Sequence, residues 1–222
     1  MKVKICGIKT SEDIDTVLKA GVDAIGFLVG QVHKSPDFIL PSTAGRLAAA
    51  LPPFVTPVLV THLNSVEEII DIVAKSSIGT VQLHGNLTPE QVKEISDKLP
   101  PGGKIILATY INKSNTPDIL EYYPFISAVL LDAFNESRDR IETGSPVEYC
   151  WEAAAEFIKT CSVPVILSGG LNPANLKEAL TACKPYAVDV NRGVKENHGG
   201  KCCLFHCRSF VRTARLASQE QE

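Results

Sequence analysis

The sequence contains no apolar run of the roughly 18 residues that a membrane-spanning helix needs. Its N-terminus lacks the apolar stretch of a signal peptide, and its Lys and Arg residues are scattered along the chain rather than gathered in blocks. The formal net charge is only −3, so nucleic acid is a poor partner for this chain. These absences predict a cytoplasmic protein with no membrane and no nucleic-acid partner, acting on small molecules.

The sequence also lacks the pattern of a disulfide framework. It has seven cysteines, an odd number at irregular spacings, in a chain of 222 residues that is long enough to bury a core without covalent staples. We therefore expect free thiols, and a single domain over residues 1–222.

Short β-branched runs alternate with amphipathic stretches of helical period along the whole chain. The eight predicted strands are Val3–Ile8, Ala24–Val29, Pro57–Thr61, Thr80–His84, Lys104–Tyr110, Ala128–Asp132, Pro164–Ser168 and Ala187–Asn191. Predicted helices between them include Ser11–Ala20, Ser65–Ala74, Pro89–Leu99 and Pro173–Ala182. Capping residues precede three of these helices, namely Thr10 or Ser11, Ser65 and Thr88.

Alternation of this kind requires a parallel sheet, and eight strand–helix units in a chain of about 250 residues are typical of an α/β fold of the (β/α)8 TIM-barrel type. An open doubly wound sheet is the competing architecture. Its Gly-rich dinucleotide fingerprint is missing, because the first turn carries a single glycine, Gly7. The barrel is therefore the predicted fold.

Barrel enzymes place their chemistry at the carboxyl ends of the strands. Cys6 closes the first predicted strand and Asp132 closes the sixth, so they are candidates for a general base and a general acid. Strand periodicity puts Lys4 on the same face as Cys6, where a buried ammonium would favour the thiolate. A purely structural role stays open for both residues: Cys6 as a small core side chain, and Asp132 as the cap of a turn.

Glycines follow the seventh and eighth predicted strands, each before a helix. Such turns expose backbone N–H groups to a phosphate. The predicted phosphate-binding residues here are Ser168, Gly169, Gly170, Asn191, Arg192 and Gly193. The predicted ligand is a sugar phosphate or a related metabolite.

Several segments, in this order along the chain, resemble the phosphoribosylanthranilate isomerase family of tryptophan biosynthesis. They are Lys4-Ile-Cys6-Gly7-Ile8, residues 20–27, Val81-Gln-Leu-His84-Gly85, Leu130-Leu-Asp132, residues 167–173, and Val188-Asp-Val190 with Gly193-Val194. The resemblance implies an aldose–ketose isomerase that performs an Amadori rearrangement, with Asp132 as the acid and Cys6 as the base. It implies no metal and no organic cofactor.

The chain departs from the family pattern at three loops. The family usually has a Ser-Pro-Arg-type stretch whose arginine holds the anthranilate end, whereas this chain has Asp37, which would repel a carboxylate. The glycine-rich element after the sixth strand is reduced to one glycine, Gly144, a further phosphate candidate, and Asn191-Arg192 replaces two small hydroxyl residues. Candidate substrate contacts are Lys34, with His33 as its alternative, His84 and Asp189.

Three hypotheses follow from these residues. The chain is a working phosphoribosylanthranilate isomerase, or a divergent barrel isomerase acting on another phosphorylated aminosugar, or a catalytically silent relative that binds a ligand. Retention of both Cys6 and Asp132 argues against the last of these. Both a monomer and a homodimer are compatible with the sequence.

Overall fold

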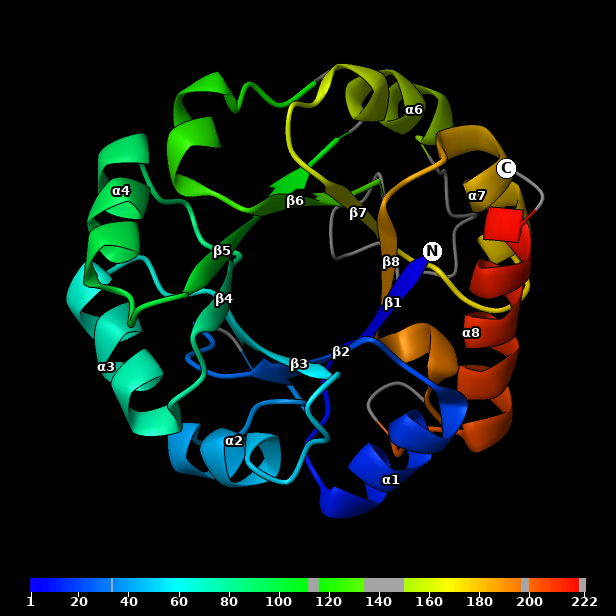
Figure 1. Cartoon of the computed structure of the whole chain (residues 1–222), viewed down its shortest axis with the longest axis horizontal. Coiled ribbons are helices and arrows are strands. Elements are labelled where there is room, and N and C mark those ends of the chain that lie inside the picture. The colour runs from blue at the N-terminus through cyan, green and yellow to red at the C-terminus, as the bar shows by residue number, and fades with distance from the viewer. Residues whose placement is uncertain (33, 112–115, 134–149, 197–199, 220–222) are drawn as a thin grey trace.

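Eight parallel strands close into a barrel in chain order, with β1 paired to β2 on one side and to β8 on the other. The structure, a computed structural model, describes residues 1–32, 34–111, 116–133, 150–196 and 200–219. Figure 1 looks down the barrel, with the helices arranged around the outside and α8 lying between α1 and α7. The predicted (β/α)8 fold is confirmed.

The observed elements follow the predicted alternation closely. The strands are β1 Lys2–Ile5, β2 Ala24–Leu28, β3 Thr56–Thr61, β4 Thr80–Leu83, β5 Lys104–Tyr110, β6 Ala128–Asp132, β7 Val165–Ser168 and β8 Ala187–Val190. The α-helices are α1 Ser11–Ala20, α2 Pro41–Ala48, α3 Val66–Ser76, α4 Pro89–Lys98, α6 Trp151–Thr160, α7 Leu176–Cys183 and α8 Leu204–Gln219. Two 3-10 helices, η1 Leu120–Phe125 and η2 Arg192–Val194, complete the described elements.

The first strand is shorter than predicted. It ends at Ile5 rather than Ile8, because Gly7 has a φ of 72° and turns the chain out of the sheet. The backbone N–H of Cys6 still donates to Val190 O at 2.8 Å. Cys6 therefore directly follows the strand and is still bonded to β8.

Local side-chain bonds fix where the helices begin. Thr10, Ser65 and Thr88 are the N-caps of α1, α3 and α4, and Thr88 forms a reciprocal capping box with Gln91. The predicted helix Pro173–Ala182 begins only at Leu176. It starts late because Asn172 Oδ1 accepts from the backbone N–H groups of Ala174 and Asn175, which holds those residues in a turn.

The connection from β5 to β6 carries a 3-10 helix, η1, with Pro124 inside it. Proline has no N–H to donate to a helical ladder, so it favours a short helix of this type over a longer α-helix. This short helix stands in the outer layer between α4 and α6 (Figure 1).

Apolar side chains form two cores. The larger one lies between the strands and the surrounding helices, and the smaller one fills the barrel interior. The interior core contains Cys6 together with Leu28, Val60, Leu130 and Ile166, all of them from different strands. Within the described part of the chain, no helix is both long and apolar enough to cross a membrane.

Candidate active site

Cys6 lies inside the barrel, at the carboxyl end of β1, with 6% of its surface exposed. It belongs to the interior core and not to the layer between strands and helices. Its thiol therefore faces the space that the strand ends enclose, as the sequence predicted.

A buried ion pair lies one layer below Cys6. Lys4 Nζ donates to Asp189 Oδ1 at 2.9 Å, and both side chains are less than a tenth exposed. These residues face each other across the β1–β8 pairing, where Lys4 is in register with Asp189. Asp189, a predicted substrate contact, thus has Lys4 as its partner in the structure.

The environment of Cys6 contains two opposing influences on its pKa. Burial raises the pKa of the thiol, whereas the Lys4 ammonium, which also hydrogen-bonds the sulfur, lowers it. Burial has the larger effect, and the Asp189 carboxylate adds to it, so the pKa of Cys6 stands above its ordinary value. Lys4 favours the thiolate as expected, but it does not make the thiolate the resting form.

Gly26 in β2 creates the space that Cys6 and Lys4 occupy. A Cβ at this position would lie 2.7 Å from Cys6 Sγ and 3.1 Å from Lys4 Nζ. A side chain larger than hydrogen would therefore displace the thiol or the ammonium.

Asp132 ends β6 and is half-buried. Leu130, two residues earlier, belongs to the same interior core as Cys6, and strand alternation places Asp132 on that face. The carboxyl group therefore stands at the barrel mouth, one layer above Leu130, as the sequence predicted. The backbone carbonyl of Asp132 accepts a hydrogen bond from Ile111 N at 3.1 Å, which fixes the end of the strand.

An aromatic row crosses the ends of β3, β4 and β5. The rings of His62 and His84 stack with centroids 4.7 Å apart, and Tyr110 tilts against His84 at 5.6 Å. Tyr110 is in register with Asp132, so the row runs up to the proposed acid. The sequence singled out His84 alone. His62 was missed, because the chain around it gives no polar pattern beyond the end of a strand.

The loop after β7, where phosphate-binding residues are predicted, has a backbone that depends on glycine. Gly169 and Gly170 both have positive φ, 99° and 63°, which side-chain-bearing residues rarely adopt. Asn175 Nδ2 donates to Gly170 O at 3.0 Å and holds the loop in place. Asn175 is a supporting residue that the sequence analysis did not identify.

The loop after β8 packs directly on the loop after β7. A Cβ on Gly193 would lie 2.0 Å from Leu171 O, so only glycine allows this approach. The two predicted phosphate loops are therefore neighbours. Arg192, beside Gly193, is exposed.

Asp37, which we expected to repel a carboxylate, already has cations beside it. Its carboxylate is buried, lies 2.7 Å from Lys195 Nζ, and accepts from Asn191 Nδ2 at 3.1 Å. Lys9 Nζ lies 3.6 Å from the same carboxylate. The two lysines were missed at the sequence level, because nothing in their spacing links them to Asp37.

Of the remaining predicted residues, the structure describes one. Lys34 is exposed on the loop after β2, and Gly144 and His33 lie outside the described residues. Among the described ranges, no group of three or more His, Cys, Asp and Glu side chains is placed to hold a metal ion.

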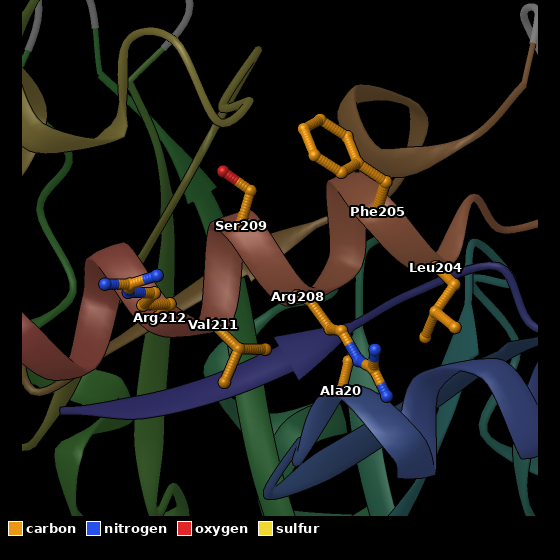
Figure 2. A pocket seen from close by; sticks show the side chains of 7 residues that line it. All are labelled: Ala20, Leu204, Phe205, Arg208, Ser209, Val211 and Arg212. Atoms are coloured by element: carbon orange, nitrogen blue, oxygen red, sulfur yellow. The ribbon is translucent and has the colours of Figure 1, made fainter.

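One surface groove lies on the outer helices, along α8. Figure 2 shows Arg208 of α8 beside Ala20 at the end of α1, with Leu204 pointing to the same side of the helix and Phe205 to the opposite side. This groove belongs to the outer helical layer, whereas Cys6 faces the barrel interior. The predicted catalytic residues therefore lie apart from this groove.

A parallel barrel that gathers a thiol, a carboxyl group and two glycine-shaped loops at the carboxyl ends of its strands belongs to the (β/α)8-barrel enzymes. The family model of N-(5'-phosphoribosyl)anthranilate (PRA) isomerase matches residues 3–211. The chain belongs to this family, and the expected resemblance is confirmed.

Individual relatives agree with this assignment. N-(5'-phosphoribosyl)anthranilate isomerase 2 of Methanosarcina mazei is 35% identical over 202 residues, which cover 90% of this chain and 88% of the relative. The crystal structure of phosphoribosyl anthranilate isomerase from Thermotoga maritima has a TM-score of 0.82 and 32% identity, covering 97% of this chain and 98% of that one. A crystal structure of such an isomerase in complex with reduced 1-(o-carboxyphenylamino)-1-deoxyribulose 5-phosphate has a TM-score of 0.79 and 31% identity, with the same coverage.

Proposed function

We propose that the chain converts N-(5'-phosphoribosyl)anthranilate to the 1-deoxyribulose phosphate in tryptophan biosynthesis, with Asp132 as general acid and Cys6 as general base. Membership of the isomerase family supports the reaction. The observation that supports the roles most directly is the interior position of Cys6, in hydrogen-bond contact with the Lys4 ammonium.

The proposed reaction begins at the ribose ring. Asp132 delivers a proton to the ring oxygen, the bond from that oxygen to C1' breaks, and the aromatic nitrogen forms an iminium ion with C1'. Cys6 then removes the proton from C2', and the electron pair neutralises the iminium to give an enol-amine. The enol-amine becomes the 1-deoxyketose when C1' takes back the proton held by Cys6 and the 2'-hydroxyl gives up its own proton, which replaces the one that Asp132 delivered. The protons therefore balance and no oxidant is consumed.

The raised pKa of Cys6 fits this sequence of steps. In the unliganded protein burial keeps the sulfur protonated at neutral pH. The iminium ion places a positive charge beside the sulfur, which together with Lys4 favours release of the thiol proton to water and leaves the thiolate at the step that needs it. The base is thus formed in the presence of its substrate.

The phosphate of the substrate is assigned to the paired loops after β7 and β8. Backbone N–H groups around Gly169, Gly170 and Gly193 are the donors that such a ligand prefers, and Ser168 and Arg192 flank them. Gly144 is proposed to contribute from the loop after β6. All of these residues come from one chain, and we propose that it acts on this small molecule in the cytoplasm without a cofactor.

Two experiments test the proposal. Expression of the chain should restore growth without tryptophan to a bacterial strain that lacks this isomerase, and the purified protein should turn over the substrate. Cys6→Ala and Asp132→Asn should each lower kcat by about two to four orders of magnitude. Cys161→Ala, which removes a thiol on the outside of the barrel, is the matched control and should leave kcat unchanged.

Each outcome has a direct meaning. A well-folded parent protein that shows no turnover would refute the reaction. Turnover at the parental rate by Cys6→Ala or Asp132→Asn would refute the role of that residue, while leaving the reaction in place.

A further inference from the structure

The aromatic row of His62, His84 and Tyr110 lies one layer above the interior core of the barrel. Val60 belongs to that core, and Ala108 packs against it. His62 and Tyr110 each follow one of these residues by two positions, so alternation along the strands places both on the interior face. His84, directly after β4, stacks on His62 and lies between the other two strands. The row therefore stands at the carboxyl ends of β3, β4 and β5.

The three rings differ in how much of their surface is open. The planes of His62 and His84 are only 11° apart, and both side chains are half-buried. Tyr110 is tilted by 39° against His84 and is 54% exposed. A tyrosine that exposes more than half of its surface contributes little to the core. Its ring is instead available for contact with a ligand.

The two ends of the proposed substrate determine which strands each end meets. Its phosphate is assigned to the loops after β7 and β8, and its reacting carbons lie between Cys6 and Asp132. The aromatic ring is at the end of the molecule opposite the phosphate. In this closed barrel of eight strands, β3 and β4 lie opposite β7 and β8 (Figure 1). The aromatic ring therefore extends towards the side of the barrel that carries the row.

The proposed acid connects this end of the substrate to Tyr110. Asp132 protonates the ring oxygen of the ribose, which is bonded to C1', and C1' also carries the aromatic amine. The aromatic ring is thus only a few bonds from the atom that Asp132 serves. Tyr110 is in register with Asp132 on the neighbouring strand, and neighbouring strands are about 4.8 Å apart. Tyr110 is therefore within reach of that ring.

We propose that the aromatic row binds the aromatic ring of the substrate, with Tyr110 in contact with it and with His62 and His84 holding the tyrosine in position. Planar rings attract one another in offset or edge-on arrangements, which the tilt of Tyr110 allows. The inference rests on the proposed function and adds to it the residue that selects an aromatic amine. It favours such an amine over the alternative of another phosphorylated aminosugar.

The test compares two stable ligands by calorimetry. One is reduced 1-(o-carboxyphenylamino)-1-deoxyribulose 5-phosphate, and the other carries a methyl group in place of its carboxyphenyl group. Tyr110→Leu should raise Kd for the aromatic ligand by about threefold to tenfold, the range of a lost aromatic pair, and leave Kd for the methyl compound nearly unchanged. KM for N-(5'-phosphoribosyl)anthranilate should rise by a similar factor with little change in kcat, because the contact is present in both the ground state and the transition state.

Further variants make the comparison specific. Tyr110→Phe keeps the ring and should restore a low Kd for the aromatic ligand. Tyr186→Leu is the matched control, since Tyr186 is 57% exposed and stands directly before β8, at the opposite end of the barrel. It should alter neither Kd. Circular dichroism checks that each variant is folded, and Tyr110→Met gives the same comparison if the leucine variant does not fold.

The possible results separate the two proposals. If the parent turns over N-(5'-phosphoribosyl)anthranilate and loss of the Tyr110 ring changes Kd equally for both ligands, or for neither, the role of the aromatic row is refuted while the proposed function stands. If the parent neither turns over this substrate nor binds either ligand, the proposed function fails and the assignment of the row fails with it.

Discussion

Replacing Lys4 by methionine should destabilise the protein strongly, because it leaves the Asp189 carboxylate alone inside the barrel. The two groups are 2.9 Å apart, with side chains only 4% and 7% exposed. Removing one partner of such a buried pair costs about 3–5 kcal/mol of the free energy of unfolding. For a chain of this size each kcal/mol lowers Tm by about 2–4 °C, so Tm should fall by roughly 6–20 °C.

Urea denaturation followed by circular dichroism measures the effect. The matched control is Lys75→Met, which breaks the pair of Lys75 and Asp71 on the surface of α3, where both side chains are more than half exposed. That change should lower the free energy of unfolding by only about 0.3–0.5 kcal/mol. The double variant Lys4→Met/Asp189→Leu should recover most of the stability, because it removes both charges and fills a similar volume.

Activity should not recover in the double variant. Lys4 hydrogen-bonds Cys6 and lowers the pKa of its thiol, and neither replacement residue can do this. If Lys4→Met lowers the free energy of unfolding by less than about 1 kcal/mol, the Asp189 carboxylate is not left unpaired. The reasoning from burial would then be wrong.

Two further predictions concern pH and packing. The pKa of Cys6 is raised above 9.0 and that of Lys4 above 10.5, so at alkaline pH the unfolded chain releases these protons first, and the free energy of unfolding should fall as pH rises above about 9. Urea titrations of the parent and of Cys6→Ala at pH 8 and pH 10 measure this, and an equal fall in both proteins would exclude Cys6 as a cause. Gly26→Ala should lower kcat by about tenfold or more, because its Cβ would lie 2.7 Å from Cys6 Sγ. A steady-state assay that returns the parental kcat would mean that the thiol does not need its present position.

Much of the fold could be predicted because it depends on local patterns. The β-branched run Lys104–Tyr110 and the capped segment Ser11–Ala20 have their predicted bounds in the structure. The short 3-10 helix around Pro124 was not anticipated, since the chain there lacks a clear helical period. The face that Cys6 occupies could also be predicted, because side chains alternate regularly between the two faces of a strand.

The buried contacts of Asp37 could not be predicted in the same way. Lys195 and Asp37 are 158 positions apart, and each lies in a loop, where residue type does not determine side-chain direction. Asp37 alone suggests repulsion of an anion. Only its buried contacts with Lys195 and Asn191 reveal that it serves as a counter-ion.

The pairing of β1 with β8 also determines when the site can exist during synthesis of the chain. Lys4 and Asp189 are separated by 185 positions, and the barrel is open until β8 joins β1. A nascent chain that has emerged only through β7 therefore contains Cys6 and Lys4, but it lacks the Asp189 counter-ion and the strand that closes the barrel. Because so distant a contact is slow to form, we expect the pairing of β1 with β8 to be a late step in folding.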